Sequence, residues 1–209
     1  MMAAGTAVEL VGRRLRLRPL VAGDFEAWRE VRRRCRAWLE CWEPRPSLAG
    51  GDVVEDRRAF AARCTARERE RQLGTGYGFA IMVDQRLGGE RLAGEINLSS
   101  IQRGPFQNAY VGYWVDEALA GRGYVPEAAV LLFRFAFEEL GLHRLQVSII
   151  PRNRPSRRVA QKLGLREEGV ALRYLEINGS WEDHVRYAIT TEEWAERRSA
   201  YLEEWVLSS

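Results

Sequence analysis

Residues 113–125 read YWVDEALAGRGYV, and this stretch decides the fold class because a strand ends in it and a helix begins. The apolar run Tyr113 to Val115 is followed by a polar turn with glycine at positions 121 and 123, and then by an amphipathic segment that reaches Leu140. The first N–H groups of a helix have no backbone acceptors, and with the helix dipole they form an anion site. The turn therefore predicts a place for a phosphorylated ligand, although two glycines before a helix are also common in ordinary tight turns.

A second strand-to-helix junction follows along the chain. Residues 145–150 form a short apolar strand that ends at Pro151, and a helix is expected over residues 154–163, with Gly164 at its end. Two strands joined by one helix run parallel, and ligands bind at their carboxyl ends. We therefore expect both junctions to face one cleft.

The remaining pattern predicts an α/β fold with helices flanking a mixed sheet. Strands are expected over residues 10–17, 78–83, 91–101, 110–115, 169–177 and 181–190, and helices from Asp24, over 53–72, over 125–140 and over about 191–206. Asn178-Gly179 is the preferred pair for a type I′ hairpin turn. We expect one domain, residues 1–209, with about seven mostly antiparallel strands around a parallel central pair.

Composition excludes several classes of protein. The net charge is only +3, and the basic residues are almost all arginine, spread along the chain and interleaved with acids, so we do not expect a nucleic-acid binder. The sequence shows neither an apolar run of about 18 residues nor a charged-then-apolar leader, so we expect a cytoplasmic protein without a membrane anchor.

Scarce residue types also limit the chemistry. The three cysteines show no paired metal-ligand spacing, and two histidines are too few for a histidine-rich metal site, so we expect no metal. A lysine Schiff base would have to use Lys162, the sole lysine. Any chemistry should therefore use carboxylates, hydroxyls and backbone amides.

The two junctions together resemble the GNAT acetyltransferases. The second junction reads PRNRPSRR over residues 151–158, followed by Leu163-Gly164-Leu165, and this Asn-x-x-Ser helix start and the turn after it are typical of that family. Leu165 stands where phenylalanine is common, and Ala118 where the family often has Gln or Arg. Within the family, Trp42-Glu43-Pro44, the strand with Asn97, and the hairpin from Asn178 to His184 look most like the RimJ and RimL branch, which acetylates the N-terminal α-amine of ribosomal proteins.

This resemblance implies acetyl-CoA as the cosubstrate. The backbone of the glycine turn would hold its pyrophosphate, the strand end would pair with the pantetheine arm, Asn153 would bind the arm, and Arg157 or Arg158 could meet a phosphate or remain solvated. The expected cofactor-binding residues are Trp114, Val115, Gly121, Arg122, Gly123, Tyr124, Asn153, Ser156 and Arg157.

Acetyl transfer needs a protonated leaving thiol and a neutral amine. By the resemblance, Ser156 is the first candidate for the acid, or it caps a helix beginning at Arg157. Glu95 is a candidate base because it shares a strand face with Asn97; a solvated strand face is the alternative. Glu176 is a further candidate, although it lies beside the position where RimL-like enzymes carry their base.

The sequence says less about the acceptor amine and the residues that bind it. Trp42, Asn97, Tyr174 and Asp183 are the expected substrate-binding residues, each with a structural alternative. We expect transfer to a protein N-terminal α-amine by direct attack on the thioester, and a ribosomal protein fits the resemblance. An α-amine suits this chemistry because its pKa is about 8, against about 10.4 for lysine. The alternatives are a small-molecule amine, such as an antibiotic or polyamine, or a non-catalytic CoA-binding module; a monomer and a homodimer both remain open.

Overall fold

The computed structural model describes residues 8–45, 52–85 and 89–207. The strands are β1 (Leu10–Val11), β2 (Leu15–Arg18), β3 (Tyr77–Gln85), β4 (Gly89–Gln102), β5 (Asn108–Val115), β6 (Arg144–Ile149), β7 (Arg166–Ile177) and β8 (Ser180–Thr190). The α-helices are α1 (Phe25–Arg34), α2 (Arg36–Glu40), α3 (Arg57–Leu73), α4 (Tyr124–Arg134), α5 (Arg154–Lys162) and α6 (Thr191–Trp205). Short turns of helix are η1 (Ala22–Asp24), η2 (Glu117–Leu119) and η3 (Phe135–Glu139), the last of which continues α4 as a π-helical turn.

Eight strands of the described residues form one open sheet in the order β1-β2-β3-β4-β5-β6-β8-β7. The expected count of about seven is corrected because the predicted strand 10–17 divides into β1 and β2, which fold back on each other as an antiparallel pair with Leu10 opposite Leu17. The predicted parallel pair is confirmed as β5 and β6, and the other neighbours are antiparallel. Asn178 and Gly179 have φ values of 47° and 83°, which confirms the hairpin turn between β7 and β8.

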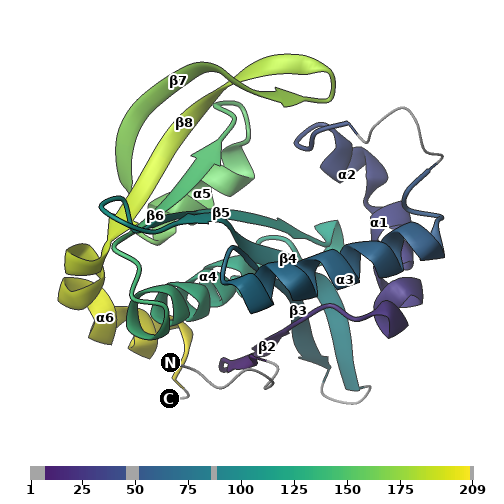
Figure 1. Ribbon diagram of the computed structural model, residues 1–209, viewed down its shortest axis with the longest axis horizontal. Helices are drawn as coiled ribbons and strands as arrows, with labels where there is room; N and C mark the ends of the chain where they lie inside the picture. Colours follow the sequence, from purple (N-terminus) through teal and green to yellow (C-terminus); the bar gives the residue numbers. More distant parts are fainter. Residues whose placement is uncertain (1–7, 46–51, 86–88, 208–209) are drawn as a thin grey trace.

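The parallel pair separates soon after it begins. Only Asn108, Ala109 and Tyr110 are in register with β6, where they face residues 144–146. Beyond this point β5 stays paired with β4, and β6 stays paired with β8, up to their ends. The sheet is thus split between residues 111–115 and residues 147–149, at the carboxyl ends where the sequence predicted a cleft (Figure 1).

Helices cover both faces of the sheet. Alternation along β3 sends Phe79, Ile81 and Val83 into the main core with α4, α5 and α6, and sends Ala80 and Met82 to the opposite face. There α1 and α3 supply Phe25, Trp28 and Phe60. Among the described residues, no helix combines the length and the apolar character needed to cross a membrane.

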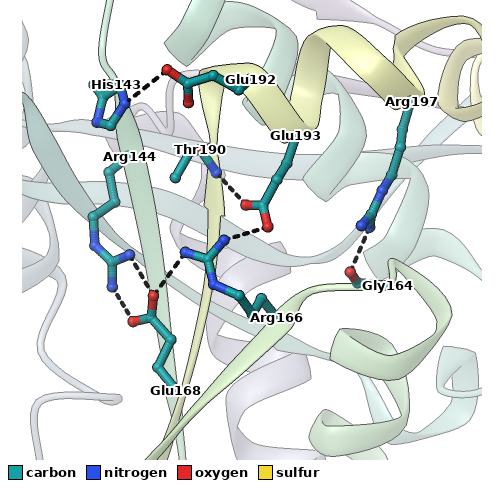
Figure 2. A network of polar contacts seen from close by, with 9 residues as sticks. All are labelled: His143, Arg144, Gly164, Arg166, Glu168, Thr190, Glu192, Glu193 and Arg197. Carbon is teal, nitrogen blue, oxygen red and sulfur yellow. Dashed lines mark hydrogen bonds and ion pairs between the residues drawn. The ribbon is translucent and has the colours of Figure 1, made fainter.

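Ion pairs fasten the carboxyl-terminal part of the chain to β6. Glu168 of β7 accepts from both Arg144 of β6 and Arg166, and Arg166 also pairs with Glu193 of α6 (Figure 2). Glu193 in turn accepts from the backbone N–H of Thr190 at 2.8 Å and so closes the start of α6. These two arginines hold the pKa of Glu168 down to about 2. The network keeps β6, β7 and α6 together on one side of the split.

Candidate active site

The split in the sheet opens into a cavity of about 430 Å³. Its walls come from α2, the end of β5, the glycine turn with the start of α4, and the start of α5. The two junctions that the sequence singled out therefore lie in one cavity, as predicted. The described lining residues are Trp38, Leu39, Trp42, Glu43, Tyr113, Trp114, Val115, Leu119, Ala120, Gly121, Gly123, Tyr124, Val125, Pro126, Asn153, Pro155, Ser156, Arg158, Val159 and Lys162.

The glycine turn takes a backbone conformation that suits glycine. Gly121 and Gly123 have φ values of 77° and 84°, and Gly123 is the residue immediately before α4. A Cβ at position 121 would meet nothing within 4 Å, so the turn is open on that side. The free N–H groups at the start of α4 thus face a cavity that is accessible to a ligand.

A buried carboxylate holds this turn from behind. Glu127 is fully buried in α4 and accepts from the backbone N–H and the Nε of Arg14, both at 2.7 Å. Arg14 also donates to the carbonyl oxygen of Arg122 at 3.0 Å. The sequence analysis did not identify this ion pair. The feature that could have indicated it is a single acidic residue within the apolar run 125–133.

The end of β5 offers unpaired backbone groups. Trp114 and Val115 pair with β4 on one side, opposite Glu95 and Gly94, and line the cavity on the other. Gly94 allows this close pairing, because a Cβ there would lie 2.1 Å from the carbonyl oxygen of Trp114. An extended ligand could hydrogen-bond to the open edge as an added strand does.

Asn153 and Ser156 lie at the start of α5. The Asn153 side chain accepts from the Ser156 N–H at 3.2 Å, so Asn153 is the N-cap and the helix begins at Arg154. The alternative that Ser156 caps a helix beginning at Arg157 is therefore wrong. The Ser156 hydroxyl instead lies 2.8 Å from the Tyr113 hydroxyl. The chain thus places two hydroxyls side by side in the cavity wall.

Tyr113 is in its protonated form at neutral pH. Burial raises the pKa of Tyr113 to about 12, and the hydrogen bond to Ser156 opposes this rise only in part. A phenol with such a pKa is a hydrogen donor throughout the physiological range.

Of the two candidate arginines, the structure turns Arg158 toward the cavity and Arg157 away from it. The Nε of Arg157 donates to the Tyr187 hydroxyl at 3.0 Å, and its guanidinium lies 3.7 Å from Glu167. The expectation of Arg157 as a ligand residue is corrected accordingly. Arg158 and Lys162, one turn apart on α5, line the cavity and provide its positive charge.

Glu95 does not line this cavity. It is 7 % exposed, and its carboxylate accepts from Trp28 at 2.9 Å, from Trp114 at 3.2 Å and from Arg63 at 2.5 Å. It lines a neighbouring cavity of about 690 Å³ instead. The alternative of a solvated strand face is also wrong, because Glu95 is buried and accepts three hydrogen bonds.

The other expected residues lie outside the 430 Å³ cavity, except for Trp42. Asn97 lines a small cavity beside Arg67 and Gly78. Tyr174 contacts the His184 ring, with centroids 5.6 Å apart, and Asp183 accepts from the Arg173 N–H across the hairpin. Glu176 is exposed on β7, opposite Trp181, and contributes to none of these cavities.

The segment after α2 closes one side of the cavity. Trp42 and Glu43 both line it, and the carbonyl oxygen of Glu43 accepts from the N–H of Asn178 at 2.9 Å. Arg45 adds a hydrogen bond to the Asn178 side chain at 3.0 Å. The tip of the β7–β8 hairpin is thereby held near α2, toward which Figure 1 shows it reaching.

Within the described residues, no cluster of three or more His, Cys, Asp or Glu side chains is arranged to hold a metal ion. The available groups are hydroxyls, one carboxylate, two basic side chains and free backbone amides. This set suits a phosphorylated ligand at one end and proton transfer at the other.

Comparisons with known proteins agree with this geometry. The chain is 35 % identical over 180 residues to the probable N-acetyltransferase YjcK of Bacillus subtilis, covering 86 % of this chain and 96 % of that protein. It is 29 % identical to the ribosomal protein uS5-alanine N-acetyltransferase of Escherichia coli, over 84 % of this chain and 88 % of the relative. Mycobacterium smegmatis RimJ, solved in complex with CoA-disulfide, superposes with a TM-score of 0.83 at 30 % identity, over 96 % of this chain and 94 % of that one. The model of the acetyltransferase (GNAT) domain matches residues 14–166, and the protein therefore belongs to the GNAT family of acetyl-CoA-dependent N-acyltransferases.

Proposed function

We propose that the protein transfers the acetyl group of acetyl-CoA to the N-terminal α-amine of a protein, by direct attack of the amine on the thioester. The observation that carries the proposal is the split between β5 and β6, where a glycine turn at a helix start, an open strand edge and a hydroxyl pair line one cavity. Full-length similarity to an enzyme that acetylates the alanine of ribosomal protein uS5 supports a protein acceptor.

The donor would be held mainly by backbone. The amides of residues 121–124 would bind the pyrophosphate, and Arg158 or Lys162 would meet a phosphate. The free edge at Trp114 and Val115 would pair with the pantetheine arm, with Asn153 beside it. Arg14 and Glu127 would keep the turn in place without touching the ligand.

The leaving thiol would receive its proton from the hydroxyl pair. Ser156 and Tyr113 share a hydrogen bond, so a proton given by one can be replaced from the other. The raised pKa keeps the Tyr113 hydroxyl protonated at neutral pH, so it can donate a hydrogen bond to the sulfur as negative charge develops there.

The test is an acceptor panel read by mass spectrometry. The purified enzyme and acetyl-CoA would be incubated with short peptides that begin with Ala, Ser, Thr or Met, and with small amines such as polyamines and aminoglycosides. We expect one acetyl group on the N-terminal nitrogen of the preferred peptide, and no product from the same peptide with a blocked N-terminus. Acetylation confined to small amines would refute the protein acceptor, and turnover with neither class would refute catalysis on these acceptors.

A further inference from the structure

A single acidic residue lines the cavity. Among the described residues that line it, Glu43 is the one acid, while its charged counterparts, Arg158 and Lys162, lie on α5. The hydroxyl pair of Tyr113 and Ser156 lines the same cavity. Glu43 is therefore the one carboxylate there that could accept a proton during the reaction.

Glu43 also lies where two cavities meet. A second cavity, of about 690 Å³, is lined by residues of α1, α2, α3, β4 and the hairpin tip. Glu43 and Trp114 are the described residues that line both cavities. A group that lies in the larger cavity can therefore meet Glu43, which also lines the smaller one.

The surroundings fix the position of this carboxylate. Arg32 of α1 donates to both of its oxygen atoms, at 2.7 Å and 2.5 Å, and the Arg32 guanidinium itself lies 5.2 Å from the centroid of the Trp114 ring. The Glu43 backbone is held by Asn178, as described above. Of the other nearby charges, Arg152 lies over the Trp42 ring and is paired with Glu182.

The carboxylate keeps room for a substrate. Its side chain is 28 % exposed, against 9 % for Glu95. Each carboxylate oxygen has two acceptor positions, so the two bonds from Arg32 leave further capacity. Glu95 lies deeper and already accepts from Trp28, Trp114 and Arg63.

We propose that Glu43 is the catalytic carboxylate that binds the acceptor amine and takes its proton. The proposal rests on the proposed function in that it assigns a role in the same acetyl transfer. It replaces Glu95 and Glu176 in this role, because Glu95 lines the cavity next to the donor site rather than the donor site itself, and Glu176 lines neither.

The amine nitrogen forms a bond to the thioester carbon, the carbon–sulfur bond breaks, and the sulfur leaves with its electron pair. An amine that arrives as the ammonium first gives one proton to Glu43, which releases it to water. After the neutral nitrogen has attacked, it loses a second proton to Glu43, and the sulfur gains one from the Tyr113–Ser156 pair. The products are an amide and the free thiol, and the two proton-transfer groups return to their starting states by exchange with water.

The test compares Glu43→Gln with wild type on the best amine of the panel, from pH 6 to pH 9. We expect kcat to fall about 100-fold or more at pH 7, which is within the usual contribution of a general base. The deficit should shrink as the pH rises past about 8, because water then removes the proton from an α-amine unaided. Glu30→Gln is the matched control: Glu30 forms an exposed ion pair with Arg34 on α1 and lies outside these cavities, so turnover should be unchanged.

Each outcome is decisive. Glu43→Gln turnover within twofold of wild type, or a deficit that stays constant across the pH range, overturns the proposal; loss in Glu95→Gln alone assigns the role to Glu95. If Glu43→Gln does not fold, Glu43→Asp replaces it: the negative charge beside Arg32 is kept, but the shorter side chain moves the carboxylate oxygens back from the acceptor amine. Turnover within twofold of wild type, or a deficit that stays constant with pH, overturns the proposal for this variant as well. If wild type accepts only small amines, the protein-acceptor proposal fails, and the same variants on the small amine still decide the role of Glu43.

Discussion

At the scale of single residues, the site depends on which hydroxyls are free to act. Because Asn153 caps α5, the Ser156 hydroxyl is released from helix capping and bonds to Tyr113. The sequence could not distinguish these roles, since Asn153 and Ser156 are both good capping residues. The side chain that completes the pair comes from β5, and only the parallel packing of β5 beside β6 brings it to α5.

Tyr113→Phe should lower kcat by about tenfold to 100-fold while the affinity for CoA stays within about threefold, because proton donation is lost and the cavity keeps its shape. Steady-state kinetics and calorimetric CoA binding would measure both. Tyr110→Phe is the control: it changes the same residue type on the same strand, outside the cavity. Equal losses in the two variants would show a general effect of altering β5.

The pH dependence of wild type should reflect the same residue. The folded-state pKa of Tyr113 is raised to about 12, so its protonated form persists until the pH approaches that value. We therefore expect no decline in kcat on the alkaline side below about pH 10 that is due to Tyr113. A decline near pH 8 that disappears in Tyr113→Phe would contradict this assignment.

At the scale of elements, the strand and helix order was predictable because each element carries its own periodicity and its own stop signal. In the carboxyl-terminal half, the ends of the elements are marked by the glycine turn, Pro151 and Asn178-Gly179. The predicted boundaries there agree with the structure to within a few residues. Residues 10–17 were less informative, because the alternation of apolar and polar residues continues across the turn at Gly12 that separates β1 from β2.

The long-range ion pairs were not predictable, since arginine and glutamate occur throughout the chain. The network around Glu168 illustrates this, because its members come from β6, β7 and α6 (Figure 2). The folded pKa of Glu168 lies at about 2, below its ordinary value of 4.5. Its contribution to stability is therefore complete above about pH 4.5 and is lost as the pH falls toward 2.

Glu168→Gln should lower the free energy of unfolding by about 1–2 kcal/mol at pH 7, because two charge-assisted hydrogen-bond partners lose their acceptor charge. The difference in Tm between wild type and variant should narrow as the pH falls below about 4.5. Thermal unfolding followed by circular dichroism between pH 3.5 and pH 7 would test this. The exposed Glu203→Gln on α6 is a control for removing one negative charge. A difference in Tm that is constant over this range would contradict the role of the network.

At the scale of the whole molecule, the two parts of the sheet meet along only three residue pairs between β5 and β6. Further contacts across the split come from α4 and α5, from the hairpin tip bound near α2, and from the Tyr113–Ser156 pair. A ligand that fills the cavity touches both parts at once. Binding should therefore stabilise the folded chain as a unit.

Acetyl-CoA at about 100 times its Kd should raise the stability by about 2.7 kcal/mol, which corresponds to about 5–10 °C in Tm for a chain of this size. Differential scanning fluorimetry with a concentration series would measure the shift. Arg158→Ala with Lys162→Ala should reduce it at a fixed concentration, because the positive charge of the cavity is removed. A shift that is equally large in this double variant would place the phosphates elsewhere.

The split in the sheet also affects whether one chain can aggregate with another through an open strand edge. An unpaired strand edge on the outside of a sheet invites another polypeptide to add to it. Here the unpaired stretch at residues 111–115 is internal: β4 occupies its other side, and β6 still closes the gap at its beginning. A narrow, flexible molecule can enter this gap, whereas a second strand with its flanking structure has no comparable access. The backbone groups that would pair with the donor under the proposed function are thus withheld from aggregation by their position within the sheet.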